Sequence, residues 1–284
     1  WYNETLGTAT RGTRREFPAV AVIVVEAAKV TIYDGDDPDM SMWMVFNQGD
    51  SDGQNLMLNR FMGNLKSVSM LNGNLFICGN STSSADRGGG VWINFISEIS
   101  YAFGSVDAQA EKIFGFLLHN ISQRNTILGT DIYGDMSTKY QLVDNSQCND
   151  VAMTVLPNAP IDDTTGLPIP TIAVATDGGI SFILDNGTVI DNYRGTNEVT
   201  SIAFDVDNSV IFTWGTTSGA PRHITRLINS VWKVASSSNS LWTNNYFSSV
   251  SEGLGNSAGN YETAASGVVT VANSGRHFAI DYGS

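Results

Sequence analysis

Tight turns of the Asp-Gly and Asn-Gly type, set between short apolar runs, constrain the fold of this chain more than any other feature. Asp, Asn and Gly tolerate the positive φ that two-residue hairpin turns require, so apolar runs around such turns predict antiparallel hairpins. The pattern is clearest between Thr171 and Trp214, where it predicts consecutive short strands. The expected strands are residues 171–175, 180–184, 188–193, 200–204 and 209–214, with the turns Asp177-Gly178-Gly179, Asp185-Asn186-Gly187 and Asp205-Val206-Asp207-Asn208 among them.

The same pattern recurs along the rest of the chain, in runs rich in Val, Ile, Thr and aromatic residues. Four-stranded meanders spaced by about 40 to 50 residues are typical of β-propellers. The fold class is therefore expected to be all-β, a β-propeller-like array of four-stranded meanders with about five or six blades. Tandem β-sandwich modules are the alternative, because they also consist of short alternating strands. The further strands are expected at residues 19–25, 29–33, 41–46, 67–71, 75–78, 91–96, 101–103, 222–228, 231–234, 268–272 and 277–282.

We expect residues 1–284 to form a single propeller-like β domain. Residues 1–17, with three arginines, are expected to be an N-terminal arm. Residues 157–170 hold four of the seven prolines, and proline fixes an extended backbone without a ladder donor, so this stretch is expected to be an inter-blade loop. An apolar stripe in residues 107–120 favours a short helix, with a strand as the alternative.

Charge and cysteine content exclude several classes of partner. The chain has 15 Lys and Arg against 28 Asp and Glu, a net charge of −13, which argues against nucleic acid as a partner. The longest apolar run, residues 19–25, is too short to cross a bilayer, so membrane insertion is not expected. Cys78 and Cys148 are expected to be free, buried thiols rather than a disulfide or a zinc site.

Residues 149–183 (NDVAMTVLPNAPIDDTTGLPIPTIAVATDGGISFI) resemble a segment of large structural proteins of tailed bacteriophages that leads into a propeller-like β domain. Residues 30–46 (VTIYDGDDPDMSMWMVF) and 91–96 (VWINFI) are similar to the same family. The resemblance implies a virion location, in the tail or on the particle surface. It also implies contacts with other virion proteins and with copies of the same chain. No functional residues follow from it.

One acidic loop is a candidate metal site. Asp34, Asp36, Asp37 and Asp39 lie between two expected strands, and Ca²⁺ prefers several oxygen ligands of this kind. The spacing differs from that of an EF-hand, and a solvated acidic turn is the alternative. Ca²⁺ is the only cofactor that the sequence brings into question.

Three aromatic residues are the candidate contacts with a ligand or partner. Trp242, Tyr246 and Phe247 lie in a Ser- and Asn-rich stretch, residues 236–260, which is expected to be a surface loop. Exposed aromatic side chains stack on sugar rings and anchor protein interfaces.

The expected function is that of a structural, tail-associated virion protein without enzymatic activity, which acts through protein–protein contacts. Recognition of a host-surface glycan or protein is an additional role that the sequence leaves open. The alternative is a lectin-like carbohydrate-binding module. A second alternative is a glycoside hydrolase or depolymerase, which needs two carboxylates placed across a cleft. Glu98, Glu111, Glu198, Glu252 and Glu262 are available for that role, but their positions in sequence do not pair any two of them.

Overall fold

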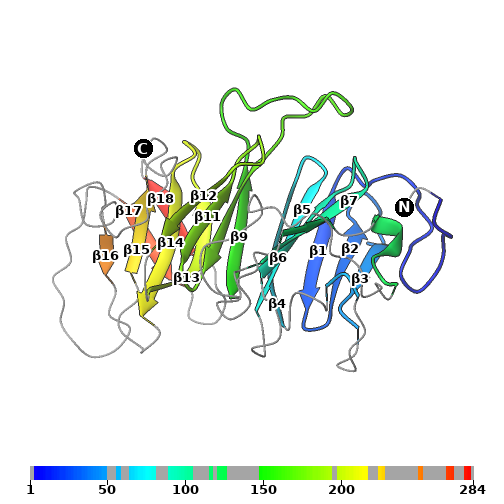
Figure 1. The fold of residues 1–284 in the computed structure, drawn as a ribbon, viewed down its shortest axis with the longest axis horizontal. Coiled ribbons are helices and arrows are strands. Elements are labelled where there is room, and N and C mark those ends of the chain that lie inside the picture. Colours follow the sequence, from blue (N-terminus) through cyan, green and yellow to red (C-terminus); the bar gives the residue numbers. More distant parts are fainter. Residues whose placement is uncertain are drawn as a thin grey trace.

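Short antiparallel strands make up almost all the regular structure of the chain in a computed structural model (Figure 1). The single helical element among the described residues is a 3-10 turn, η1 (Ile121–Gln123). No helix in that part of the chain has the length and apolar character needed to span a membrane. The structure describes residues 3–49, 56–58, 64–80, 89–104, 115–117, 120–126, 147–193, 197–216, 223–227, 249–251, 267–271 and 278–282.

Each strand pairs with the strand next to it in sequence, so every sheet in the described part of the chain is an antiparallel meander. The first sheet contains β1 (Ala21–Glu26), β2 (Lys29–Asp34) and β3 (Met42–Asn47). The second contains β4 (Asn64–Leu71), β5 (Asn74–Asn80), β6 (Gly89–Asn94), β7 (Ile99–Gly104) and β8 (Gly115–Leu117). The third contains β9 (Cys148–Thr154), β10 (Thr171–Thr176), β11 (Gly179–Ile183) and β12 (Val189–Tyr193). The fourth contains β13 (Asn197–Phe204), β14 (Val210–Thr216), β15 (His223–Leu227) and β16 (Ser249–Ser251), and the last is a hairpin of β17 (Gly267–Val271) and β18 (Phe278–Tyr282).

Local turn chemistry explains the hairpins. The five strands expected between Thr171 and Trp214 are β10 to β14, with ends shifted by no more than three residues. Asn72 and Gly73, which connect β4 to β5, both have positive φ, 49° and 72°. This is the backbone conformation that an Asn-Gly hairpin turn requires. Since strands make up almost all the described regular structure, the all-β expectation is confirmed.

The first four sheets pack side by side, with a hydrophobic core between each adjacent pair. One core lies between the β1–β3 and β4–β8 sheets, the next between the β4–β8 and β9–β12 sheets, and a third between the β9–β12 and β13–β16 sheets. In β10, Ile172 and Val174 enter one core while Ala173 and Ala175 enter the other. Because both faces of this strand are buried, its sequence is continuously apolar instead of alternating.

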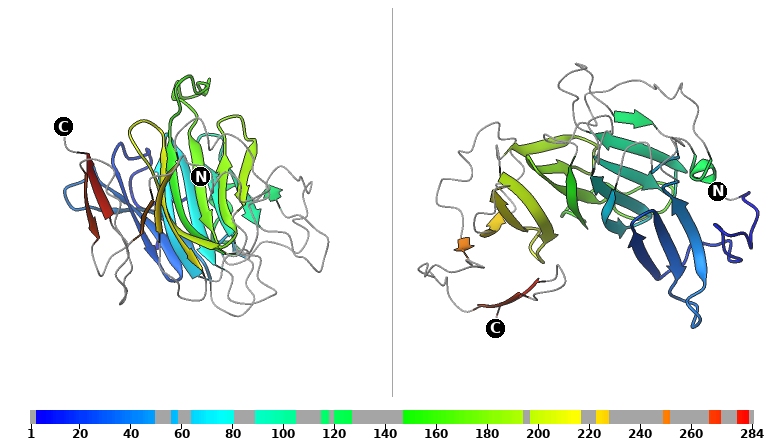
Figure 2. Two further views of the ribbon diagram at one scale, coloured as in Figure 1. Left: turned by 90° about the vertical axis from the view of Figure 1, so that its left-hand side faces the viewer. Right: turned by 90° about the horizontal axis from the view of Figure 1, so that it is seen from below.

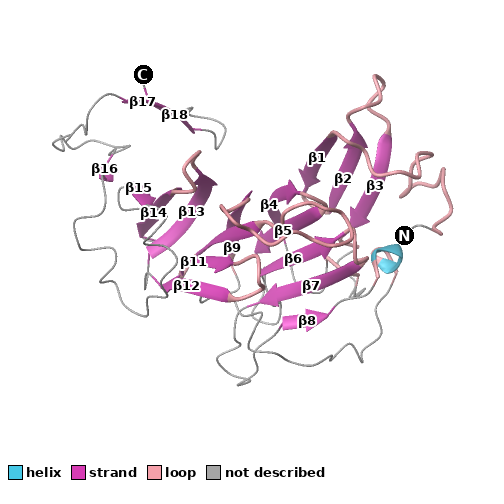
Figure 3. Cartoon of the chain, turned by 90° about the horizontal axis from the view of Figure 1, so that it is seen from above, coloured by secondary structure: helices cyan, strands magenta, loops and turns pink. Residues whose placement is uncertain are grey.

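The first strands of neighbouring sheets contact one another. β9 contacts both β4 and β13, and β1 contacts β4. Figure 3 shows β4, β9 and β13 adjacent in the middle of the molecule, with the later strands of each sheet further out. The right-hand view of Figure 2 shows the sheets following one another in a curved row that does not close into a ring among the described residues.

The same irregularity occurs at the start of each of these three central strands. The pairing register skips Lys66 in β4, Asn149 in β9 and Thr200 in β13, which is the mark of a β-bulge. The residue after the bulge is Ser67 in β4, Asp150 in β9 and Ser201 in β13. Three successive sheets therefore share one structural repeat that has little literal sequence identity.

Asp150 connects the three repeats. Its Oδ1 accepts a hydrogen bond from Ser67 Oγ at 2.6 Å, and its Oδ2 accepts one from Ser201 Oγ at 2.9 Å. The backbone N–H of Ile202 also donates to Oδ2, at 3.0 Å. One carboxylate thus ties together the β4–β8, β9–β12 and β13–β16 sheets.

The described part of the N-terminal segment, residues 3–20, lies against β3 and forms no strand. The backbone N–H of Gly12 donates to the Trp43 carbonyl at 2.9 Å, and a Cβ at Gly12 would clash with the Met42 carbonyl oxygen, so the close approach requires glycine. Arg11 Nη1 donates to the same Trp43 carbonyl at 2.8 Å. The arm expected for residues 1–17 is thus firmly attached to the first sheet over its described part.

Two details of the chain's organisation differ from the sequence expectations. The proline-rich loop connects β9 to β10, which are neighbours in one sheet, so it does not join two sheets. Of the short helix expected at residues 107–120, residues 115–117 form the strand β8, the alternative at that position. Proline content identified the loop correctly but carried no information on which strands it joins.

Candidate functional site

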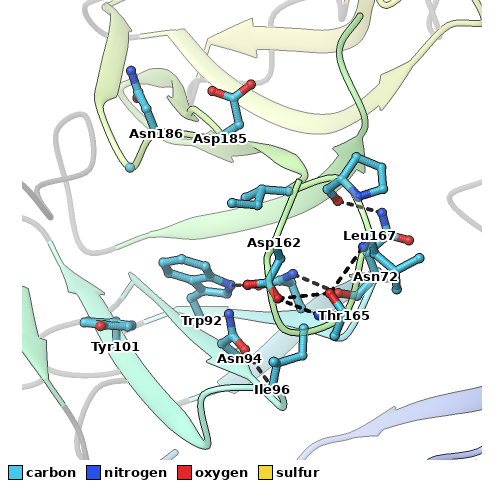
Figure 4. A pocket seen from close by; sticks show the side chains of 14 residues that line it. Asn72, Trp92, Asn94, Ile96, Tyr101, Asp162, Thr165, Leu167, Asp185 and Asn186 are labelled. Atoms are coloured by element: carbon cyan, nitrogen blue, oxygen red, sulfur yellow. Dashed lines mark hydrogen bonds between the residues drawn. The ribbon is translucent and has the colours of Figure 1, made fainter. Parts of the chain in front are cut away.

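A pocket of about 240 Å³ opens between the β4–β8 and β9–β12 sheets. Its walls come from the β4–β5 turn, from β6 and β7, from the β9–β10 loop and from the β11–β12 turn (Figure 4). The lining residues are mostly aromatic, amide or carboxylate: Asn72, Asn74, Trp92, Asn94, Ile96, Tyr101, Asp162, Thr165, Leu167, Pro168, Ile169, Asp185, Asn186 and Gly187.

Trp92 and Tyr101 form an aromatic pair in one wall. They are directly opposite each other in the β6–β7 pairing, and their rings stack with centroids 5.4 Å apart and an interplanar angle of 26°. Trp92 Nε1 donates to Asn74 Oδ1 at 3.0 Å, which fixes the indole. Both side chains are half-buried, so the pair has an inner part in the core and an outer part that reaches the pocket.

The proline-rich loop forms another wall and is tied to the β4–β5 turn. Asn72 Nδ2 donates to the Pro168 carbonyl at 2.7 Å, across the two sheets. Within the loop, Ile161 pairs with Pro168 as an isolated bridge. In Figure 1 the loop projects beyond the ends of the strands at the top of the molecule. These contacts give the pocket a preformed shape.

Hydrogen bonds also fix the polar side chains in the walls. Asp162 Oδ1 accepts from the backbone N–H groups of Thr164 and Thr165, each at 3.0 Å, and the Thr165 N–H is the main cause of the lowered pKa of Asp162. Asn94 Oδ1 accepts from the Ile96 backbone, and Asn186 Oδ1 from the Thr188 backbone, both at 2.9 Å. Each of these two amides therefore holds its oxygen against the backbone.

Figure 4 shows Asp185 and Asn186 on the far side of the pocket from the Trp92–Tyr101 pair. A small ligand between them meets an aromatic surface on one side and amide and carboxylate groups on the other. Pockets of this kind bind molecules that have both apolar patches and many hydroxyl groups, which describes a sugar ring. The lining residues include no His, Cys, Lys or Arg.

The four aspartates of the candidate metal site lie in and after β2, far from this pocket in sequence. Arg14 Nη1 contacts Asp34 Oδ1 and Oδ2 at 2.8 and 2.7 Å and Asp36 Oδ2 at 3.1 Å. Asp36 also accepts from the backbone N–H of Ala19 at 2.7 Å, and this hydrogen bond is the main cause of its lowered pKa.

The other two carboxylates serve the turn itself. Asp37 Oδ1 accepts from the backbone N–H of Asp39 at 3.0 Å, and a hydrogen bond from Ser41 is the main cause of the lowered pKa of Asp37. Throughout the described residues, no three His, Cys, Asp or Glu side chains form a group that could hold a metal ion. The geometry therefore gives no support to the calcium expectation at Asp34, Asp36, Asp37 and Asp39.

The three candidate aromatic contacts, Trp242, Tyr246 and Phe247, lie outside the described residues. The pocket instead uses Trp92, which the sequence places in the middle of a strand, where core packing is the usual fate. Its one local signal is the Asn-rich context of the strand ends, with Asn72, Asn74 and Asn94 at two adjacent turns. These asparagines do not indicate a pocket in the sequence, because the pocket forms only where the two sheets pack together.

Both thiols lie in the core between the same two sheets. Cys78 and Cys148 are fully buried and free, as expected from their low number and wide spacing. Burial raises the pKa of Cys78 well above its usual range, and contact with Cys148 adds to the effect.

No family model matches the chain, and no curated protein matches it either.

Proposed function

We propose that this chain is a saccharide-binding protein that takes a sugar residue into the pocket between the β4–β8 and β9–β12 sheets. The observation that carries the proposal is the fixed Trp92–Tyr101 pair facing Asp185 and Asn186 across a cavity of about 240 Å³. Aromatic rings contact the apolar faces of sugars, while amides and carboxylates hydrogen-bond the hydroxyl groups. This is the lectin-like alternative of the sequence analysis, now with specific residues.

Asp162 does not fit the role of the general acid of a glycosidase. A glycosidase needs one carboxyl group with a raised pKa as its general acid, whereas the pKa of Asp162 is lowered. Its Oδ1 is also engaged by the loop backbone. A carboxylate held in this way can accept hydrogen bonds from a ligand but is a poor proton donor.

The test is binding of the purified protein to a glycan panel, followed by titration of the best hit. We expect Trp92→Ala to weaken that binding by about tenfold or more, which corresponds to roughly 1.4 kcal/mol. Trp214→Ala is the matched control, because Trp214 is also a half-buried strand tryptophan beside a core but does not line the pocket. Equal losses in both variants, or a wild-type protein that ignores every glycan, would contradict the proposal.

We propose further that the sheets are blades of a propeller-like array, with tandem sandwiches as the competing arrangement. The support is the shared bulge in β4, β9 and β13, the contacts between these first strands, and the bridging role of Asp150. Repeated units with their first strands around a common axis are the organisation of a propeller. An experimental density map tests this, since five or six blades around one axis support it and two-layer modules contradict it.

The wider biological proposal is a tail-associated virion protein that assembles with copies of itself and with other virion proteins. It is supported by the sequence resemblance alone. A saccharide site would give such a protein a means to recognise the surface of a host cell. Proteomics of purified phage particles that encode this chain, together with its mass in solution by light scattering, tests both the location and the self-association.

A further inference from the structure

The described segments that supply the turn and loop walls of the proposed saccharide pocket carry only acidic charges. We define the rim as residues 72–74, 94–98, 156–170 and 184–188, all of which the structure describes. These segments contain no Lys, Arg or His. They contain the carboxylates Glu98, Asp162, Asp163 and Asp185.

Two of these carboxylates reach the cavity itself. Asp162 and Asp185 both line the pocket, and both are half-buried. Charges that are partly shielded from water interact more strongly with a ligand than fully exposed charges do. An anionic ligand would meet two like charges there, so acidic sugars are disfavoured.

The aromatic wall also favours a positively charged ligand group. The faces of Trp and Tyr rings carry negative electrostatic potential and attract cations. The Trp92–Tyr101 pair lies across the pocket from Asp185 (Figure 4). A cationic group between them is attracted from both sides.

We propose that the pocket selects a saccharide with a protonated amino group, such as a free hexosamine, over neutral or acidic sugars. The inference rests on the proposed saccharide binding and names its substrate class. Asp185 is the charge partner of the ammonium group, and the Trp92–Tyr101 pair contacts the ring. The amide groups of Asn94 and Asn186 are placed in the walls for the hydroxyl groups.

The experiment compares two oligomers of equal length, one of glucosamine and one of N-acetylglucosamine, by calorimetric titration of the full chain. N-acetylation removes the positive charge but keeps the sugar ring. We expect the glucosamine oligomer to bind about five- to tenfold more tightly, with a preference that falls as salt is added. Equal affinities, or tighter binding of the N-acetylated oligomer, would overturn the selectivity and leave saccharide binding intact.

Two variants locate the effect. Asp185→Asn is expected to abolish the preference for glucosamine, because the amide keeps the size of the side chain and removes its charge; the readout is the ratio of the affinities for the two oligomers in each variant. Asp163→Asn, which removes the same charge from the neighbouring loop at an exposed position outside the pocket, is expected to keep the preference. If both variants lose it equally, the preference comes from net charge and the assignment to Asp185 is overturned.

Tetramethylammonium separates this inference from the function on which it rests. Binding of this cation without binding of either oligomer or of any panel glycan would contradict saccharide recognition while showing a cation site. Wild-type protein that binds only neutral or acidic panel glycans would contradict the charge selection alone. Failure to bind any of these probes would overturn both proposals.

Discussion

Asp150 shows how much a single residue can contribute to the packing of whole sheets. Its two oxygens accept hydrogen bonds from Ser67 in one sheet and from Ser201 and the Ile202 backbone in another. Removing the carboxylate leaves these donors without their acceptor between packed strands. We expect Asp150→Ala to lower the free energy of unfolding by about 2 kcal/mol or more, measured by urea denaturation.

The control for this variant is Asp163→Ala, which removes an exposed carboxylate from the proline-rich loop. Its effect should stay within about 0.5 kcal/mol. If the two variants unfold at the same urea concentration, Asp150 does not hold the three sheets together.

Asp36 gives the fold a contribution that depends on pH. Its pKa is lowered from 3.8, first by the Ala19 N–H and then by Arg14, so the ionised form is preferred in the folded state. The contribution is therefore present above pH 3.8 and is lost as the pH falls through the lower pKa of the folded state. We expect Asp36→Asn to lower the melting temperature at pH 7, and the gap from wild type to narrow below pH 3.8. Asp39→Asn in the same loop should leave melting at pH 7 almost unchanged, and a gap that stays constant with pH would contradict the assignment.

Among the elements, the N-terminal arm depends on buried charge in an unusual way. Arg124 is 1% exposed and donates to Glu4 Oε1 and Oε2 at 2.8 and 2.9 Å. It also donates to the Thr10 carbonyl at 2.9 Å and to the Val45 carbonyl at 2.8 Å, so it joins the arm to β3. Removing one partner of such a network leaves the remaining groups buried without compensation.

Arg124→Met is therefore expected to destabilise the chain by about 3 kcal/mol and to loosen the arm. Trypsin cleavage at the exposed Arg15, followed by mass spectrometry, should be much faster in the variant than in wild type. Lys29→Met, which removes only an exposed ion pair with Glu26, should cost less than about 1 kcal/mol and leave cleavage slow. Unchanged cleavage in Arg124→Met would show that other contacts attach the arm.

The elements also show what the sequence could predict. Strands bounded by Asn-Gly or Asp-Gly turns, such as β4, β5, β10 and β11, were located because a turn is a property of two or three adjacent residues. The sequence did not predict β9, because this strand follows no such turn and precedes the proline-rich loop. The burial of Arg11 and Arg124 was not predicted either, since nothing in the neighbouring sequence distinguishes them from surface arginines.

The pocket could not be predicted from local sequence patterns either. Its walls come from four separate segments, which meet only because two sheets pack together. Trp92 in the pocket and the fully buried Trp43 occupy similar mid-strand positions in sequence. Only the packing of the sheets tells which tryptophan faces a cavity.

At the scale of the whole molecule, the cores between sheets protect the two thiols. Cys78 and Cys148 come from different sheets and are both fully buried in the same core. We expect a thiol reagent at neutral pH to modify them at the rate at which these sheets separate, and both at full speed in denaturant. The raised pKa of Cys78 slows its reaction further, because the thiolate is the reactive form. Rapid labelling of either cysteine under native conditions, read by mass spectrometry, would contradict the packing of this core.

The meander topology of the sheets has a consequence for how the chain folds during synthesis. Because each strand pairs with its neighbour in sequence, every described sheet can close from residues that leave the ribosome one after another. Early formation of local contacts shortens the time that unpaired strand edges are exposed to other nascent chains. The first sheets can thus serve as a template on which each later sheet is laid during synthesis, so that folding proceeds along the chain in the order of translation.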